Sequence, residues 1–435
     1  MDLTILGILG LIAFLALMFI GLPVGFSMLF VGFGGLLILL PPAAAFQIVN
    51  DTILNNFSSY TMSVVPMFIL MGEIASCSGL GDKLFQTAQV FVGHRRGGLA
   101  IAVQGCSAAF GAVCGSVFGA LALMGGVAYP QMKKYNYDDR LSTASIAAGS
   151  TLSQLIPPSV PLIIFGIITQ TSVAKLFVGG IMVGLVLMTL FMIVIAIWCR
   201  INPNLAPVAQ KSSWEEKKAA LIHGGVIEVT IVFLLAMGSM FTGVCTPTEG
   251  GSVGVLGMLI VTLLKKRCTL DVITRTVKNT ISTTALIYFL IIAAMVFGKF
   301  FTLAKIPFLL GEWVVAMDMP PFAVIMMITV IYFVLGAVMD ETPLFLLTIP
   351  VFTPIVVAAG FDPIWFGTYT VVVSTMGLIT PPVGMSCFIL QGITKVPLEK
   401  IYAGVWPFNA ALAVMVVLMF LFPQIATWLP NLIFP

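Results

Sequence analysis

Charged residues are scarce in this chain. Only 9% of its 435 residues are Asp, Glu, Lys or Arg, whereas 60% are hydrophobic. Soluble domains carry about 25% charged residues, so this composition leaves too few to cover a surface that faces water. The composition therefore excludes a soluble protein. The net charge of +3 gives no reason to expect a nucleic-acid partner, because the basic residues lie mainly in loops, where they orient the chain.

The sequence also lacks the usual signs of catalysis. It contains no phosphate-binding loop and no nucleophile placed beside a base. Its two histidines, His94 and His223, have no partner at metal-ligand spacing. A pump would need a nucleotide site on a separate subunit, and a channel would need a continuous polar pore, which is not visible. We therefore expect no enzyme activity.

Cysteine occurs without any pairing pattern. No CxxC motif is present, and most of the cysteines lie inside apolar runs. We interpret them as small packing residues with no disulfide or metal role, apart from Cys114, which lies beside a Gly-Ser pair. The seven cysteines are Cys77, Cys106, Cys114, Cys199, Cys245, Cys268 and Cys387.

Long apolar runs fill the sequence from one end to the other. The run Leu3–Ile20 follows Met1-Asp2 rather than a basic segment, so we expect it to be the first membrane span and not a signal peptide. Only helices and closed barrels satisfy their backbone groups in lipid, and runs of this length indicate helices. The predicted class is an all-α polytopic membrane protein.

Two proline pairs interrupt long apolar segments, Pro157-Pro158 in one and Pro381-Pro382 in another. Proline removes a backbone donor and clashes with the preceding turn, so each helix must break there. Inside a bilayer the freed carbonyls are tolerated only where they are buried in protein or face a polar cavity. Paired breaks near the midplane are typical of secondary transporters; the alternative is that the prolines merely kink packed helices.

The second half of the chain repeats the pattern of the first at an offset of about 224 residues, which aligns Pro157 with Pro381. The loop 131–140 contains three basic residues, whereas its counterpart, 355–364, contains none. Because cytoplasmic loops are enriched in Lys and Arg, matched loops lie on opposite sides of the membrane. The repeat is therefore predicted to be inverted, with the N-terminus outside.

Each repeat is expected to contain scaffold helices, a re-entrant helical hairpin, a broken transmembrane helix and a final helix. Both loops that flank the first hairpin are basic, so its two ends lie on the same side. The first repeat, 1–218, comprises scaffold helices over 3–78, the hairpin 97–129, the broken helix 141–170 and the helix 176–198. The second, 219–435, comprises scaffold helices over 219–298, an amphipathic interfacial arm over 300–317, the hairpin 322–359, the broken helix 365–394 and the helix 403–428.

Each half also places polar groups beside its break. In the first half the hairpin tip is Cys114-Gly115-Ser116. Carbonyls freed at Ser153, Ile156 and Pro158, with the Ser116 hydroxyl, would surround a cation with oxygen atoms, which is how transporters hold Na⁺. The equivalent groups of the second half are Gly377, Thr380 and Pro382, facing Asp340, Glu341 and Thr342.

Three carboxylates lie in apolar surroundings. A carboxylate at the centre of a membrane helix costs roughly 2.5–3.5 kcal/mol, so Asp340 and Glu341 should face a cavity or an ion. Their alternative is a charged loop at the mouth of the hairpin. Glu249 is either a capping carboxylate near a helix N-terminus or a residue of the transport path.

An anionic solute would bind where the two hairpin tips meet. Helix N-termini carry partial positive charge and free N–H groups, which suit a carboxylate. No Lys or Arg occurs in 97–132 or 336–394, so no fixed cation would hold the acid too tightly for release. The residues expected to contact the solute are Gly115, Ser116, Ser159, Glu341, Thr342 and Val383.

Several motifs, in order along nearly the whole chain, resemble those of a known family. They are Gly-Leu-Pro-Val-Gly around Pro23, Phe110–Ser116, Ile156–Ile164, Thr246–Glu249, Met339-Asp340 and Gly377–Gly384. They resemble the large membrane subunit of TRAP (tripartite ATP-independent periplasmic) transporters, the DctM type. The resemblance implies an elevator-type secondary transporter, similar to the ion transporter superfamily and driven by Na⁺.

The resemblance further implies about two Na⁺ sites or more. Cys114 departs from the usual serine, so its contact must come from the backbone or the site is weaker. The first site would comprise Cys114, Ser116, Ser153, Ile156 and Pro158. The second would comprise Met339, Asp340, Thr342, Gly377, Thr380 and Pro382.

The implied setting is the cytoplasmic (inner) membrane of a bacterium or archaeon. The implied partners are a small four-helix membrane subunit of the DctQ type and a periplasmic substrate-binding protein of the DctP type. The implied solute is a C4-dicarboxylate, a sialic or other sugar acid, or a sulfonate. A single-component Na⁺/dicarboxylate symporter of the same architecture is the alternative.

Overall fold

The computed structural model describes residues 3–207, 212–306, 309 and 320–434, and every regular element among them is a helix. Seven helices are long and apolar enough to cross a membrane by length and composition, and an eighth span results if the bent pair Trp214–His223 and Val226–Phe241 counts as one. The chain is therefore a helical, multi-pass membrane protein, as its composition predicts.

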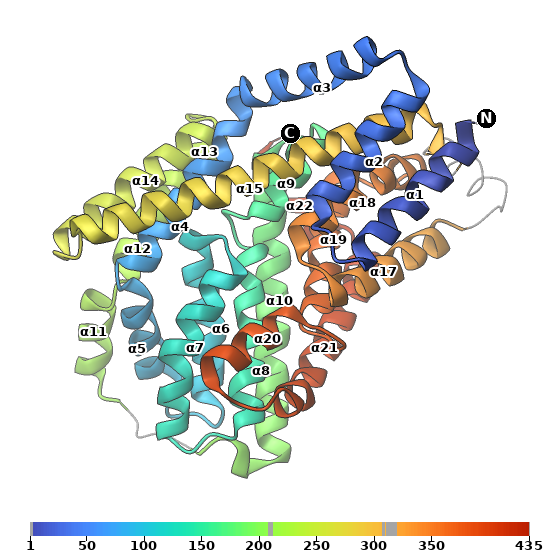
Figure 1. Ribbon diagram of the computed structural model, residues 1–435. Coiled ribbons are helices and arrows are strands. Elements are labelled where there is room, and N and C mark those ends of the chain that lie inside the picture. Colours follow the sequence, from blue (N-terminus) through green and yellow to red (C-terminus); the bar gives the residue numbers. More distant parts are fainter. Residues whose placement is uncertain (1–2, 208–211, 307–308, 310–319, 435) are drawn as a thin grey trace.

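An outer group of helices forms one flank of the molecule (Figure 1). The long helix α15 slants across this flank and packs on α2, α3 and α4, and α14 packs on α4. The outer helices are α1 (Leu3–Phe19), α2 (Val24–Leu39), α3 (Pro42–Phe57), α4 (Val64–Cys77), α14 (Pro247–Leu264) and α15 (Leu270–Leu303). A 3-10 turn, Tyr60–Ser63, leads into α4.

The rest of the first half contains a helical hairpin, a broken helix and a long helix. Helix α5 (Leu80–Val92) precedes the hairpin of α6 (Gly98–Cys114) and α7 (Val117–Lys134). The broken helix consists of α8 (Asp139–Thr151), a 3-10 turn (Leu152–Gln154) and α9 (Val160–Thr169), and it is followed by α10 (Val173–Ile201).

The second half repeats this order of elements. The hairpin is α17 (Pro321–Val338) with α18 (Glu341–Ala358), the broken helix is α19 (Pro363–Leu378) with α20 (Met385–Thr394), and the long helix is α21 (Leu398–Leu421). The remaining helices are the 3-10 turn Pro203–Leu205, α11 (Trp214–His223), α12 (Val226–Phe233), the π segment Leu234–Gly238, α13 (Ser239–Phe241) and α22 (Gln424–Ile433).

The two hairpins exchange contacts with the two broken helices. Each hairpin packs on the first part of its own broken helix, α6 and α7 on α8, and α17 and α18 on α19. In addition α7 packs on α20, and α18 packs on α9, so each hairpin also contacts the second part of the other broken helix. This exchange brings both hairpin tips and both breaks into one region of the molecule.

Local chemistry fixes the ends of these elements. Helices lose backbone partners at their N-termini, and a side-chain oxygen at the N-cap replaces one of them. Ser116 caps α7 by accepting the N–H of Gly119 at 3.3 Å, and Ser159 caps α9 by accepting the N–H of Leu162 at 3.3 Å. A proline pair and a serine cap together explain why α8 stops and α9 starts where they do.

Helix α15 extends into the first residues of the expected interfacial arm, 300–317. Helix α15 continues to Leu303, and Phe300 and Phe301 are buried, with the Phe301 ring 4.4 Å from that of Phe297. The arm was expected because of charged residues such as Lys299, but that side chain lies on the exposed face of an otherwise packed helix. Most of the remaining arm, 307–317, lies outside the described residues.

Other boundaries differ because amphipathic helices were overlooked. Helices α3 and α22 were not expected, because polar residues within them, such as Asn50 and Asp51 in α3, lower the average hydrophobicity that marks a span. The first hairpin continues beyond the expected 129 to Lys134, and the expected helix 403–428 is divided between α21 and α22.

Candidate ion and solute site

The tip of the first hairpin lies directly against the first helix break. Gly115, between α6 and α7, has a φ of +63°, and a Cβ on it would overlap the carbonyl oxygen of Pro158. One turn earlier, a Cβ on Gly111 would come within 2.7 Å of the Cα of Ser153. Glycine permits both the backbone conformation and the close approach. The structure thus places residues 111–116 beside residues 153–158.

Two carbonyl oxygens at this contact have no donor. Residues 151–159 are buried, and no N–H or O–H group in the described part of the chain donates to the carbonyl of Ile156 or of Pro158. The Ser116 hydroxyl accepts the N–H of Gly119, and it keeps a proton and a second lone pair for another partner. Buried carbonyls normally have a partner, and a cation satisfies them as well as a donor does.

The other two predicted ligands of the first site are also at the contact. Ser153 is buried, and its hydroxyl donates to the Ser107 carbonyl at 3.4 Å. The Cys114 thiol lies 4.0 Å from the hydroxyl of Ser76 on α4, and its carbonyl oxygen lies where a Cβ on Gly72 would be. The first tip is therefore enclosed between the broken helix and the outer helix α4.

The tip of the second hairpin contacts the second break in a similar way. A Cβ on Gly377 would come within 2.6 Å of the carbonyl carbon of Gly336. The N–H of Gly384 donates to the carbonyl of Ala337 at 3.2 Å, so the chain after the proline pair is bonded to the hairpin. The structure therefore places residues 336–342 beside residues 377–384.

The second break nevertheless has fewer free oxygens than the first. The Tyr402 hydroxyl of α21 lies 3.0 Å from the Pro382 carbonyl and 2.6 Å from the Val383 carbonyl, and it is the donor to these oxygens. The Gly377 carbonyl accepts the N–H of Thr380 at 2.9 Å. Pro382 is exposed, whereas Pro158 is buried. The two breaks are thus alike in backbone position but different in surroundings.

A cavity of about 560 Å³ lies between the two tips and the outer helices. This volume falls in the range of small-molecule sites, roughly 300–1,000 Å³. Of the predicted residues, the cavity lining includes Cys114, Gly115, Ser116, Asp340, Glu341 and Thr342. The outer helices α2, α4 and α15 contribute residues that include Glu73, Ser76 and Thr283, and Pro23 lies just before α2. Its lining contains three carboxylates and no Lys, Arg or His.

The other predicted residues lie at the breaks or at the second tip, and they do not line the cavity. Ser159 is buried and donates its hydroxyl proton to the Gln154 carbonyl, while Met339 is buried at the second tip. Val383 bonds through its carbonyl to α21.

Asp340 and Glu341 are half-buried at the cavity, and Asp340 caps α18 by accepting the N–H of Glu341 at 2.8 Å. Neither forms a charged loop outside the protein.

One buried glutamine joins the two halves of the site. Gln154, in the 3-10 turn before the first proline pair, is fully buried. Its side-chain amide donates to the Glu341 carboxylate at the second tip. The carbonyl oxygen of the same side chain accepts a hydrogen bond from the Thr375 hydroxyl at 2.9 Å. Thr375 lies one turn before the second break. The side chain of Gln154 therefore connects the first break both to the second hairpin tip and to the second broken helix.

Sequence reasoning did not identify Gln154, Glu73 or Tyr402. Glu73 lines the cavity, and its carboxylate accepts the side-chain N–H of Asn279 at 3.0 Å. A carboxylate or an amide inside an apolar run is costly to bury, so Glu73 and Gln154 could have been recognised in the sequence by that cost. Glu249 instead forms a capping box with Thr246 at the exposed start of α14, which is the capping alternative.

Comparison with known proteins agrees with this architecture. The family model described as "Tripartite ATP-independent periplasmic transporter, DctM component" matches residues 11–425. The chain is 28% identical over 419 residues to the sialic acid TRAP transporter large permease protein SiaM of Vibrio cholerae, covering 96% of this chain and 97% of that protein. It is 31% identical over 426 residues to the ectoine/5-hydroxyectoine TRAP transporter large permease protein UehC of Ruegeria pomeroyi, covering 97% of each.

A third relative and a solved structure complete the comparison. The C4-dicarboxylate TRAP transporter large permease protein DctM of Pseudomonas aeruginosa is 30% identical over 374 residues, 86% of each chain. The crystal structure of the Alcanivorax borkumensis YdaH transporter has a similar fold, with a TM-score of 0.61 at 15% identity over 89% of this chain and 90% of that one. These relatives are permeases and not enzymes. With a family match over nearly its whole length, the chain belongs to the tripartite ATP-independent periplasmic transporters, as the DctM-type large permease component.

Proposed function

We propose that this protein is the large permease subunit of a Na⁺-coupled, binding-protein-dependent secondary transporter, and that it imports a small organic acid by an elevator mechanism. The observation that carries this proposal is the convergence of two hairpin tips and two helix breaks on one cavity. Unwound backbone at membrane depth is tolerated where it binds ions or solute, and both tips supply such groups.

The first Na⁺ site is assigned to the contact between the first tip and the first break. The Ile156 and Pro158 carbonyls accept no hydrogen bond from the described residues, and the Ser116 hydroxyl and the Ser153 carbonyl would complete an oxygen shell. Cys114 contributes its carbonyl, since a thiol is a poor ligand for Na⁺. The second Na⁺ site is assigned to Met339, Asp340, Thr342, Gly377, Thr380 and Pro382.

The solute is assigned to the shared cavity. Gly115, Ser116, Glu341 and Thr342 line it, and the N-termini of α7 and α18 begin there. Those N-termini provide free N–H groups for an acid. The relatives named above differ in solute, and they include proteins named for sialic acid, a C4-dicarboxylate and ectoine.

An inverted pair of repeats is the architecture that we propose for this mechanism. The reciprocal packing of each hairpin on the other half's broken helix supports it. In the elevator step the hairpins and broken helices would move as one unit against α2, α4, α14 and α15. The partners that we propose are a small DctQ-type membrane subunit and a DctP-type periplasmic binding protein, with the complex in the inner membrane.

The site is tested by Ser116→Ala in the permease purified with its small subunit. The midpoint of thermal unfolding is measured at increasing NaCl, with KCl keeping ionic strength constant. We expect Na⁺ to raise the midpoint of the wild type and to require about tenfold more NaCl in the variant, because a neutral ligand lost from the ion contributes roughly 1–1.5 kcal/mol.

Ser172→Ala is the matched control. Ser172 caps α10 by accepting the N–H of Lys175 at 3.4 Å, so its loss removes a cap of the same kind far from the cavity. The proposal fails if NaCl and KCl stabilise the wild type equally. The assignment of Ser116 alone fails if both alanine variants respond to NaCl as the wild type does.

A further inference from the structure

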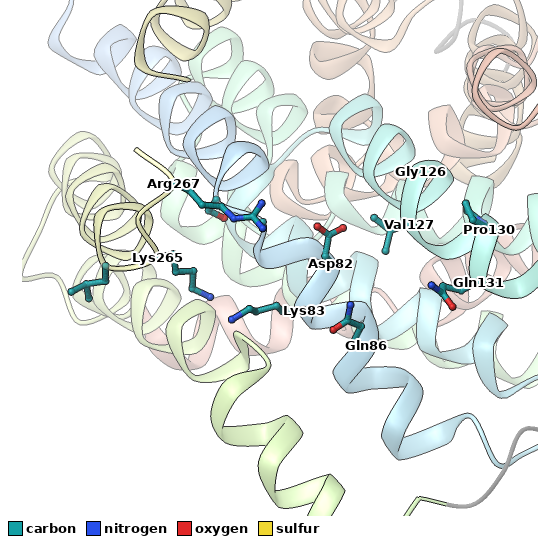
Figure 2. Close-up of a pocket in the computed structure, with 12 residues that line it drawn as sticks. Asp82, Lys83, Gln86, Gly126, Val127, Pro130, Gln131, Lys265 and Arg267 are labelled. Atoms are coloured by element: carbon teal, nitrogen blue, oxygen red, sulfur yellow. The ribbon is translucent and has the colours of Figure 1, made fainter. Parts of the chain in front are cut away.

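A second cavity, separate from the ion and solute site, lies in the seam between α5, α7 and the end of α14 (Figure 2). Its volume is about 770 Å³. It shares no lining residue with the first cavity, and on α7 the two are seven residues apart, Gly119 against Gly126, or about 10 Å along a helix. The second cavity is therefore a distinct feature of the protein.

Three basic side chains surround this cavity against one carboxylate. Lys83 lies on α5, and Lys265 and Arg267 follow the end of α14, while Asp82 is the single acidic residue in the lining. Figure 2 shows the side chains of Lys83 and Lys265 extending toward one another, with Arg267 on the side of Asp82. Like charges turned toward one space repel unless an anion lies between them.

The basic groups are incompletely paired within the protein. Lys265 forms an ion pair with Glu228 at 3.1 Å, and the charge of Lys83 also acts on that carboxylate, so Glu228 offsets part of the positive charge on this side of the cavity. Across residues 3–207, 212–306, 309 and 320–434, neither Lys83 nor Arg267 lies within 4.0 Å of a carboxylate oxygen. Donors for an oxyanion are thus available on both sides of the seam.

One wall of the same cavity is apolar and faces away from the protein. Leu264, which lines the cavity, is 77% exposed, and Leu263 and Ile260 on the preceding turn of α14 are more than half exposed. A soluble anion needs only the basic groups. A phospholipid needs both the basic groups for its phosphate and an apolar flank for its acyl chains.

The sequence places this cavity near the cytoplasmic surface. Lys265, Lys266 and Arg267 are consecutive in a short loop between two membrane helices, and such loops lie on the cytoplasmic side. Anionic lipids bind to basic pockets between membrane helices on that side.

We propose that the cavity formed by Lys83, Lys265 and Arg267 binds the phosphate of an anionic phospholipid, with its acyl chains against the exposed end of α14. The lipid joins α5, which packs on the hairpin helix α6, to α14, which packs on the outer helix α4. It therefore bridges the two groups of helices at their cytoplasmic ends. This inference does not depend on the solute or on Na⁺.

The test uses the permease with its small subunit, delipidated in a neutral detergent. Phosphatidylglycerol, phosphatidylcholine or inorganic phosphate is titrated, and the midpoint of thermal unfolding and the bound lipid in native mass spectra are measured. We expect phosphatidylglycerol to stabilise and bind, and the other two to do neither at the same concentration. In the double variant Lys83→Gln/Arg267→Gln the apparent affinity should fall about 25-fold, roughly fivefold for each charge.

Lys218→Gln is the matched control, because it removes an exposed basic residue from α11, outside the cavity. Lys83→Glu alone provides a second variant if the double variant does not fold. The proposal is overturned if the cavity variants bind phosphatidylglycerol as tightly as the wild type or as Lys218→Gln. If inorganic phosphate stabilised the protein equally, the proposal of a lipid would be overturned and the cavity would be a site for a free anion.

Discussion

Replacing Gln154 by leucine tests whether the two halves of the site act as a unit. Leucine keeps nearly the same volume but removes the amide that donates to Glu341 and the carbonyl that accepts from Thr375. A hydrogen bond to a charged group contributes about 1.5–3 kcal/mol, and a neutral one about 1 kcal/mol. Thr375 shares its one hydroxyl proton between the Gln154 side-chain oxygen and the Val371 carbonyl at 2.7 Å, so in the variant it donates to Val371 alone and only Glu341 loses its partner without replacement. We expect a loss of roughly 1–3 kcal/mol in the free energy of unfolding.

The chain offers a control for this change. Gln104 on α6 is also fully buried, and its amide donates to the Ser145 carbonyl at 2.9 Å, but its own carbonyl oxygen has no partner among the described residues. Gln104→Leu therefore removes a neutral bond and also an unsatisfied oxygen, and we expect it to cost about 1 kcal/mol or less. It contacts neither hairpin tip of the shared cavity.

The assay is equilibrium unfolding of the purified permease in mild detergent, with and without NaCl. A double-mutant cycle with Thr375→Val isolates the bond between the two helix breaks, for which we expect a coupling energy of about 1 kcal/mol. Under the proposed function Gln154→Leu also weakens the stabilisation by Na⁺, whereas Gln104→Leu does not. Equal destabilisation by the two leucine variants, with no coupling to Thr375, would refute the reasoning.

Two other perturbations follow from the same geometry. Gly115→Ala should destabilise the permease by roughly 2–5 kcal/mol, through the left-handed backbone and the overlap with the Pro158 carbonyl. Gly126→Ala in the interior of α7, whose Cβ meets nothing within 4 Å, should instead stabilise it by about 0.5–1 kcal/mol in the same unfolding assay. Asp139 is the first residue of α8. Burial raises the pKa of its carboxyl, but the hydrogen bonds that it accepts from Lys133 and a tyrosine, together with the charge of Lys133, have the larger effect and hold that pKa below its ordinary value. The stabilisation by Lys133 is therefore present above about pH 4 and lost below it, so wild type and Lys133→Gln should converge in stability as the pH falls, and a constant difference would contradict the assignment.

The parts of the fold that could be predicted are those fixed by local chemistry. A proline pair breaks a helix wherever it lies, so both breaks could be placed to within a few residues. The tips follow from caps: Gly115-Ser116 ends α6 and caps α7, and Asp340 caps α18. Helices such as α3 could not be predicted in this way, because their polar residues lower the hydrophobicity averaged over the segment. Gln154 shows the other limit. Its partners lie 187 and 221 residues away, and no local pattern encodes that distance.

The charge of the shared cavity sets an order for the events that we propose. Its lining contains Glu73, Asp340 and Glu341 and no basic residue. At an effective dielectric constant of about 20, two unit charges 4 Å apart interact by about 4 kcal/mol, so an acid that enters alone is repelled by each ionised carboxylate it approaches. A Na⁺ ion at a neighbouring break would reduce this repulsion. Under the proposed function, bound cations would therefore favour the entry of the acid, and this electrostatic coupling would precede any movement of the helices.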